Sequence, residues 1–106
     1  MQVEWTAVAL KQLDLVHKHY ADISPKLAAG IFRMLAQATE RLEQFPLSGR
    51  LGQLSGTREL IVSGLPFLVV YRVREEEVAI LRVFHTARDW PLHLGAGDDE
   101  PVGKDE

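Results

Sequence analysis

The sequence contains no cysteine among its 106 residues. This absence excludes disulfide bridges, thiolate metal sites and cysteine nucleophiles, so the fold must be stabilised by packing or by a bound partner. The chain also lacks any apolar run near the roughly 18 residues that a membrane-spanning helix needs. Its first residues do not have the basic and then apolar layout of a secretory signal. We therefore expect a cytoplasmic protein with no membrane contact.

Lysine is scarce in the second half of the chain. None occurs between Lys26 and Lys104, whereas six of the eight arginines follow residue 49. Residues 95–106 hold five acidic residues and one lysine, so the net charge of −3 leaves residues 1–94 with +1. Such a neutral domain disfavours strong nonspecific nucleic-acid binding, which depends on phosphate neutralisation. We expect one folded domain over 1–94 and a flexible, acidic, glycine-rich tail over 95–106.

Two amphipathic helices are predicted in the first half of the chain. A short alternating pattern at residues 2–5 indicates a strand, and Thr6 then offers an N-cap. Apolar residues follow at helical spacing through about Ala21. Residues 24–25 are Ser-Pro, a cap followed by the helical position where proline fits best. The apolar repeat after them predicts a second helix that extends to Phe45.

The pattern changes to that of strands after a loop expected at residues 47–52. Strands are predicted at 57–63, 67–74 and 77–85, with a two-residue turn at 75–76. The order is therefore β-α-α-β-β-β. It indicates an α+β fold in which two N-terminal helices pack on a mostly antiparallel four-stranded sheet.

The two-residue turn also predicts which side chains share a face of the sheet. It pairs Arg72 with Ala79, Val70 with Leu81 and Leu68 with Val83. One face would then carry Arg72, Arg74 and His85. The other face would carry Phe67, Val69, Tyr71, Val78, Ile80 and Phe84, interrupted by Arg82.

Five ordered motifs cover about residues 2–92 of the chain. They are Ala9-x-x-x-Leu13-Asp14-Leu15, Leu42-x-x-Phe45-Pro46-x-x-Gly49-Arg50, Thr57-Arg58-Glu59-Leu60, Leu68-Val69-Val70-Tyr71-Arg72-Val73 and Val78-Ala79-Ile80-Leu81-Arg82-Val83-Phe84-His85-x-x-Arg88. In this order they resemble the RelE/ParE superfamily of bacterial type II toxin–antitoxin toxins. The resemblance implies a cognate antitoxin that holds the toxin inactive in a heterodimer or heterotetramer. It leaves the mechanism open, because members either cut messenger RNA on the ribosome or poison DNA gyrase.

The messenger RNA endoribonuclease alternative finds only partial support in the residues. RelE-like nucleases carry an arginine where this sequence has Leu68, and no tyrosine follows Tyr71 to supply their C-terminal tyrosine. The lysines that they use in the preceding loop are also absent. A metal-independent nuclease would therefore have to use a variant acid/base and cationic set. That set is Arg58, Glu59, His85 and Arg88.

The resemblance to ParE-like gyrase inhibitors requires no catalytic set and fits the neutral charge of the domain. A protein that binds a large target uses arginine and aromatic side chains as its strongest contacts. The candidate target-binding residues are Arg50, Arg58, Arg72, Arg88 and Trp90. A third alternative is a chain without toxicity that serves only as an antitoxin-binding partner.

Purely structural roles remain open for the same side chains. His85 could end its strand bonded to a backbone carbonyl, Arg58 and Glu59 could take part in cross-strand ion pairs on a solvated face, and Arg50 could cap helix carbonyls. Trp90 could anchor the C-terminal segment on the core. The neighbouring histidines 17 and 19 do not share a helix face, so we expect no metal, and no nucleotide cofactor is implied.

Overall fold

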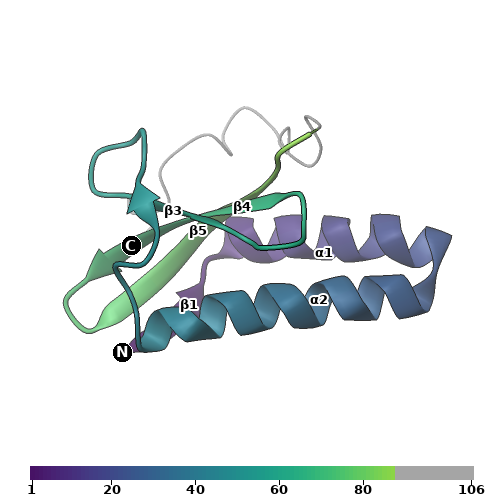
Figure 1. The fold of residues 1–106 in the computed structure, drawn as a ribbon, viewed down its shortest axis with the longest axis horizontal. Coiled ribbons are helices and arrows are strands. Elements are labelled where there is room, and N and C mark those ends of the chain that lie inside the picture. The colour runs from purple at the N-terminus through teal and green to yellow at the C-terminus, as the bar shows by residue number, and fades with distance from the viewer. Residues whose placement is uncertain (88–106) are drawn as a thin grey trace.

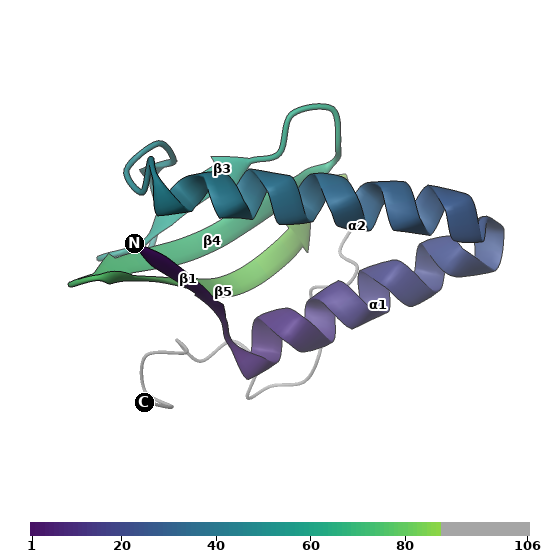
Figure 2. The same ribbon diagram turned by 90° about the horizontal axis from the view of Figure 1, so that it is seen from below.

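The structure is a computed structural model and describes residues 1–87. Two helices form a hairpin that covers one face of a five-stranded sheet (Figures 1 and 2). The elements are β1 (Gln2–Trp5), α1 (Ala7–Ile23), α2 (Pro25–Glu40), the 3₁₀ turn η1 (Arg41–Glu43), β2 (Arg50–Leu51), β3 (Arg58–Ile61), β4 (Phe67–Arg74) and β5 (Glu77–His85). The strand order is β1-β5-β4-β3-β2; β1 runs parallel to β5 and the other pairs are antiparallel. The α+β fold predicted from the sequence is confirmed.

The helices begin where the sequence places their caps. The Thr6 hydroxyl accepts the amide hydrogen of Ala9 at 3.2 Å, and Ser24 caps α2 by accepting from Leu27 at 3.2 Å. Thr6 also donates to the Ile80 carbonyl at 2.8 Å, which joins the start of α1 to β5. The second helix is shorter than predicted. It tightens into η1 after Glu40, because proline at position 46 disfavours continued helical backbone just before it.

The predicted loop at residues 47–52 contains a fifth strand. Arg50 and Leu51 form β2, which pairs with Glu59 and Arg58 of β3. A two-residue strand leaves almost no periodic signal, so the sequence pattern could not separate it from a loop. The sheet therefore has five strands rather than the four expected.

The core lies between the helix hairpin and the sheet. The helices contribute to this core the buried side chains of Ala9 and Val16 from α1 and of Ile31 and Leu35 from α2. Spacings of seven residues in α1 and four residues in α2 place each pair on one face of its helix. From the sheet, the buried side chains are Phe67, Val69, Tyr71, Val78, Ile80 and Val83.

A β-bulge in β5 makes part of the predicted register wrong. The turn and the Arg72–Ala79 pair are as expected, but Val70 pairs with Arg82, and Leu81 becomes an extra residue. Beyond this point every β5 side chain changes face, because the side-chain period of a strand is two. His85 therefore faces the helices opposite Phe67. Arg82 and Phe84 face the other way, opposite Val70 and Leu68.

Gln12 of α1 contacts β5 next to the bulge. Its side chain is fully buried, and its Oε1 accepts the amide hydrogen of Val83 at 2.7 Å. β1 ends opposite Ile80, so the strand pairing of β1 with β5 does not reach Val83. The glutamine therefore satisfies a buried backbone donor beyond the end of β1.

No helix within residues 1–87 is long and apolar enough to cross a membrane. Arg88, Trp90, the expected domain boundary at residue 94 and the acidic tail lie outside the described residues.

Candidate functional site

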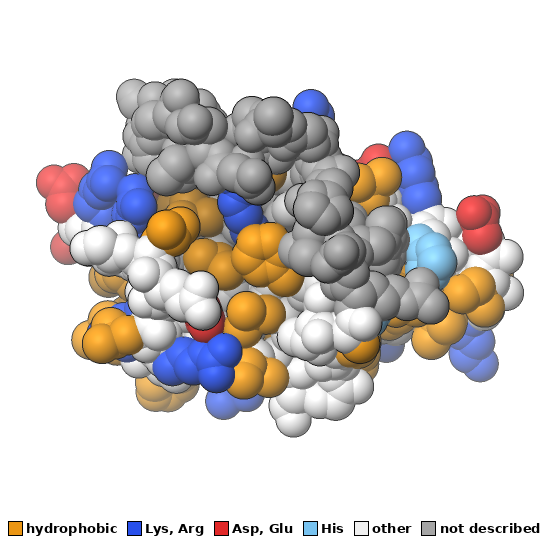
Figure 3. Space-filling view, turned by 90° about the horizontal axis from the view of Figure 1, so that it is seen from above, with side chains coloured by type: hydrophobic (Ala, Val, Ile, Leu, Met, Phe, Trp, Pro, Cys, Tyr) orange, Lys and Arg blue, Asp and Glu red, His pale blue; other side chains and the backbone are white. Residues whose placement is uncertain are grey.

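The face of the sheet opposite α1 and α2, here called the open face, carries both apolar and arginine side chains. Val70 and Leu81 are buried at its centre, and Ala79, Phe84 and, from the first turn of α1, Val8 pack against them. Figure 3 views this side of the molecule and shows hydrophobic side chains interspersed with those of Lys and Arg. The bulge contributes to this composition, since it turns Arg82 and Phe84 toward the open face. Arginine beside apolar and aromatic groups is the composition typical of protein-binding hot spots.

Arg50 and Glu59 lie on the open face and bind each other. Strand pairing aligns Arg50 with Glu59 and Glu59 with Val70. The Arg50 Nε lies 2.9 Å from Glu59 Oε1, and the amide of Gln53 donates to Oε2 at 3.4 Å. Only 13% of the Glu59 side chain is exposed, against 61% for Arg50. The carboxylate therefore connects β2 and the following loop to β3.

Arg58 holds a loop on the other side of β3. Its Nη1 donates to the Gly49 carbonyl at 2.8 Å and to the Leu47 carbonyl at 3.3 Å. Its strand partner Tyr71 acts on the same loop, donating from its hydroxyl to the Pro46 carbonyl at 2.8 Å. The hydroxyl also accepts the Gly49 amide hydrogen at 2.9 Å. This geometry gives Arg58 a structural contact and leaves it poorly placed to bind a target.

Among the target-binding candidates within residues 1–87, Arg72 is the one whose guanidinium forms no ion pair or hydrogen bond with a described residue. It is partly buried on β4, two residues from Val70 and therefore on the open face. Its Nε lies 3.9 Å from the position that a Cβ on Gly56 would occupy, so its side chain extends over the β2–β3 loop. No hydrogen bond or ion pair joins its guanidinium to another described residue. A guanidinium in this state can pair with an incoming acceptor without first breaking a contact.

His85 lies on the helix side of the sheet and is only 8% exposed. Its ring packs edge-on against Phe67 with centroids 5.2 Å apart. Nδ1 accepts the amide hydrogen of Ala87 at 3.1 Å, and Nε2 lies 3.4 Å from the Tyr20 hydroxyl. An accepting Nδ1 requires the neutral tautomer with hydrogen on Nε2, which can then donate to Tyr20. The Ala87 amide is thus one backbone partner of His85.

The four candidate nuclease residues do not converge in the part of the chain that the structure describes. His85 pairs with Phe67 and Arg58 with Tyr71, at β4 positions four residues apart. At about 3.3 Å per residue this separates them by about 13 Å along the strand. Adjacent strand residues point to opposite faces, so Glu59 is turned away from Arg58. The fourth member, Arg88, lies outside the described residues.

Sequence reasoning missed Gln12 and the hydroxyl of Tyr71 as organising groups. Gln12 lies three residues after Ala9 and four before Val16, so it shares their buried helix face. A polar residue at such a position signals a buried hydrogen bond. Tyr71 was placed in an apolar sheet face and in a family motif, but neither indicates the role of its hydroxyl, because its partners at residues 46 and 49 come from a distant loop.

Comparison with known proteins places the chain among toxins of toxin–antitoxin systems. The family model described as the ParE toxin of the type II toxin–antitoxin system, parDE, matches residues 3–90. A candidate toxin, Y4kP of Sinorhizobium fredii, is 33% identical over 93 residues, covering 88% of this chain and 96% of that protein. Toxin RelE2 of Caulobacter vibrioides is 34% identical over 87 residues, covering 82% and 97%. A solved structure of the chromosomal ParDE system from P. aeruginosa is similar with a TM-score of 0.73 and 30% identity, covering 78% of this chain and 92% of that one.

Proposed function

The chain belongs to the ParE toxin family of type II toxin–antitoxin systems, and from this premise we propose that it inhibits DNA gyrase by binding rather than by catalysis. The observation that carries the proposal is the open face of the sheet. Around a buried apolar centre at Val70 and Leu81 it presents the partly exposed side chains of Leu68, Arg72 and Phe84, and the Arg72 guanidinium has no partner within residues 1–87. A binding surface requires such a composition and needs no acid/base geometry.

The separation of the nuclease candidates supports binding over catalysis. Acid/base cleavage of RNA needs its groups within hydrogen-bonding reach of one phosphodiester. His85 is enclosed by Tyr20 and Phe67, and Arg58 is held by two loop carbonyls. Each side chain has a structural role that engages the atoms catalysis would require.

Replacement of Arg72 by alanine tests this proposal. We expect the variant to need about tenfold more protein, or beyond, to block supercoiling and to accumulate gyrase cleavage complexes, because arginine hot spots carry about 2 kcal/mol or more. Its melting temperature should stay near that of the parent, since surface substitutions usually change stability by less than about 0.5 kcal/mol. Arg33→Ala is the matched control, because Arg33 is exposed on α2, on the helix side of the molecule.

Antitoxin-free toxin that leaves gyrase supercoiling and cleavage-complex levels unchanged at molar excess would contradict the proposal. A translation extract run in parallel examines the second candidate, ribosome-dependent messenger RNA cleavage, which the similarity to the toxin named RelE2 keeps open. Codon-specific cuts that disappear in His85→Ala but persist in Arg72→Ala would favour the nuclease. Absence of both effects, with normal growth on induction, would favour an antitoxin-binding protein without toxicity.

A further inference from the structure

The first turns of α1 contact β5 around its bulge. The amide and the hydroxyl of Thr6 both donate to the Ile80 carbonyl, at 3.1 and 2.8 Å. Val8, in the first turn of the helix, packs against the apolar cluster of the open face. One turn later, the Gln12 side chain accepts the amide hydrogen of Val83 at 2.7 Å. α1 therefore holds β5 before, at and after the extra residue of the bulge.

The direction of the Val83 amide depends on the bulge. In an unbroken antiparallel strand, the backbone groups of successive residues point alternately to the two neighbouring strands. The Ile80 carbonyl faces Thr6, so in an unbroken strand the Val83 amide would point to β4. The extra residue shifts this alternation by one, and the amide points to Gln12 instead. The bond between Gln12 and Val83 is therefore a property of the bulged strand.

Gln12 takes the place of a strand at the outer edge of β5. β1 pairs with β5 only as far as Ile80, and within residues 1–87 no other strand lies beside that edge. A buried amide without an acceptor destabilises the conformation that contains it. The Gln12 oxygen supplies this acceptor, and the side chain is fully buried, so bulk water cannot take over its role.

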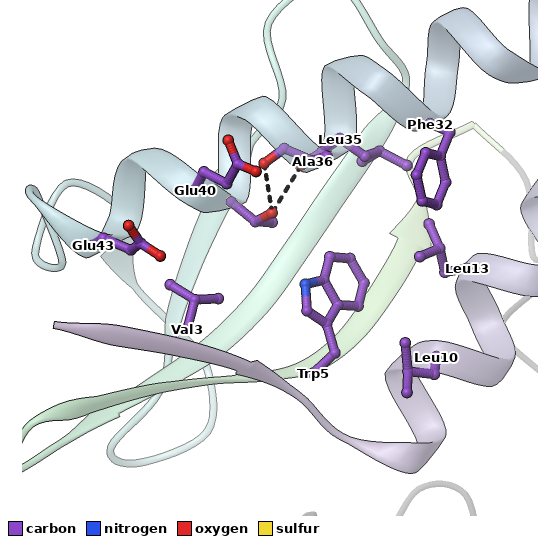
Figure 4. A pocket seen from close by; sticks show the side chains of 10 residues that line it. Val3, Trp5, Leu10, Leu13, Phe32, Leu35, Ala36, Glu40 and Glu43 are labelled. Atoms are coloured by element: carbon purple, nitrogen blue, oxygen red, sulfur yellow. Dashed lines mark hydrogen bonds between the residues drawn. The ribbon is translucent and has the colours of Figure 1, made fainter.

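Apolar packing fixes α1 less tightly on the side that faces β1 and α2. A pocket of about 360 Å³ lies there, between β1 and the helix hairpin. Its lining includes Leu10 and Leu13 of α1, Trp5 of β1 and Phe32 of α2 (Figure 4). A pocket provides few atoms in contact to resist a shift of the helix. The hydrogen bonds of Thr6 and Gln12 therefore contribute strongly to the alignment of α1 with β5.

We propose that Gln12 is a positioning residue for the open face. By accepting from the Val83 amide, it holds the last part of β5 in the bulged register, in which Arg82 and Phe84 lie on the open face. Phe84 is partly exposed there and packs against the apolar centre. The proposal rests on the proposed function, because the open face is the surface that the target would contact. Gln12 itself is buried and acts only through β5.

Gln12→Met tests the positioning role, because methionine keeps an unbranched side chain of similar length and removes the strong acceptor. We expect the Val83 amide to exchange about tenfold faster, or faster still, relative to the amides of residues 78 and 80, where β5 still pairs with β1. Nuclear Overhauser effects between Phe84 and its strand partner Leu68 should weaken in parallel. Unchanged exchange and unchanged contacts in a folded Gln12→Met variant would overturn the proposal.

The functional consequence is measured as the toxin concentration that blocks gyrase supercoiling. We expect Gln12→Met to need about threefold more protein, or beyond, because only toxin with an ordered end of β5 presents the complete open face. Ile31→Val and Leu35→Ala control for stability alone, since they truncate buried side chains of α2 and bracket the expected loss of melting temperature. Both controls should inhibit gyrase as the parent does at a temperature where all variants are folded. Inhibition that falls in step with melting temperature in all three variants would overturn the positioning role.

Gln12→Glu separates the accepting oxygen from the rest of the side chain. The Nε2 of Gln12 has no hydrogen-bond partner within residues 1–87, so the proposal depends on the oxygen. A carboxylate also accepts from a backbone amide, although its burial should lower the melting temperature. We expect Gln12→Glu to inhibit gyrase within about twofold of the parent despite that loss. A folded Gln12→Glu variant that inhibits as poorly as Gln12→Met would contradict the assignment.

The same measurements separate this proposal from the proposed function. Parent toxin without any effect on gyrase would contradict the proposed function, and the exchange of the Val83 amide would then decide whether Gln12 holds the register of β5. Full gyrase inhibition by a Gln12→Met variant whose Val83 amide exchanges rapidly would have the opposite meaning. It would leave the proposed function standing and overturn the positioning role.

Discussion

The hydroxyl of Tyr71 connects the sheet to the loop before β2, and its removal should destabilise the fold. Tyr71 is fully buried, donates to the Pro46 carbonyl at 2.8 Å and accepts from the Gly49 amide at 2.9 Å. Tyr71→Phe keeps the ring and deletes only the oxygen. The change therefore isolates two hydrogen bonds that the core depends on.

The magnitude follows from the burial of the two partners. Gly49 is buried, so its unpaired amide costs about 1–3 kcal/mol, whereas Pro46 is half-buried and its carbonyl loses only the net value of one bond, about 0.5–1.5 kcal/mol. We expect a total near 3 kcal/mol. For a domain of about 100 residues this lowers the melting temperature by about 10–20 °C.

Chemical denaturation of Tyr71→Phe, with an unchanged m-value, measures this loss directly. Tyr20→Phe is the matched control, because its hydroxyl is only partly buried and lies 3.4 Å from His85 Nε2, a long contact. It should cost less than about 1 kcal/mol. A loss below about 0.5 kcal/mol for Tyr71→Phe would refute the reasoning, as would unchanged exchange of the Gly49 amide.

Two further predictions concern backbone positions. Glu75 has φ 54° at the first position of the β4–β5 turn, so Glu75→Gly should raise the unfolding free energy by about 0.5–1 kcal/mol. The same change at Glu76, which lacks a positive φ, should not raise it. Thermal melts of both variants test this difference. A Cβ on Gly49 would lie 2.8 Å from the Glu59 carbonyl oxygen, so Gly49→Ala should cost about 1–3 kcal/mol. A Cβ on Gly30, in the middle of α2, would have no atom within 4 Å, so Gly30→Ala should instead stabilise the fold by about 0.5–1 kcal/mol. Equal changes in unfolding free energy for the two variants in urea titrations would contradict the steric argument.

The helices and the hairpin turn could be read from the sequence because their causes are local. A capping hydroxyl at Thr6, the Ser24–Pro25 pair and apolar residues at helical spacing act within a few neighbouring residues. The turn at 75–76 is likewise defined by the strands on each side of it. The family resemblance also depends only on ordered local motifs, and the comparisons confirm it.

The faces of the sheet were decided by tertiary structure. One extra residue at Leu81 exchanges the faces of Phe84 and His85, and nothing in the alternation of apolar residues marks where a bulge falls. The burial of His85 against Phe67 and the turn of Arg82 to the open face both follow from that insertion.

Partners distant in sequence account for the remaining site residues. Arg58 and Tyr71 bind backbone carbonyls at residues 46–49, and Arg50 binds Glu59. Which candidate arginines have an intramolecular partner is therefore decided only when the chain has folded. The same holds for Gln12, whose partner Val83 lies beyond the end of β1. The sequence by itself determined the elements and the family. Only the tertiary structure decided which side chains are exposed, because register and long-range hydrogen bonds are properties of the assembled sheet.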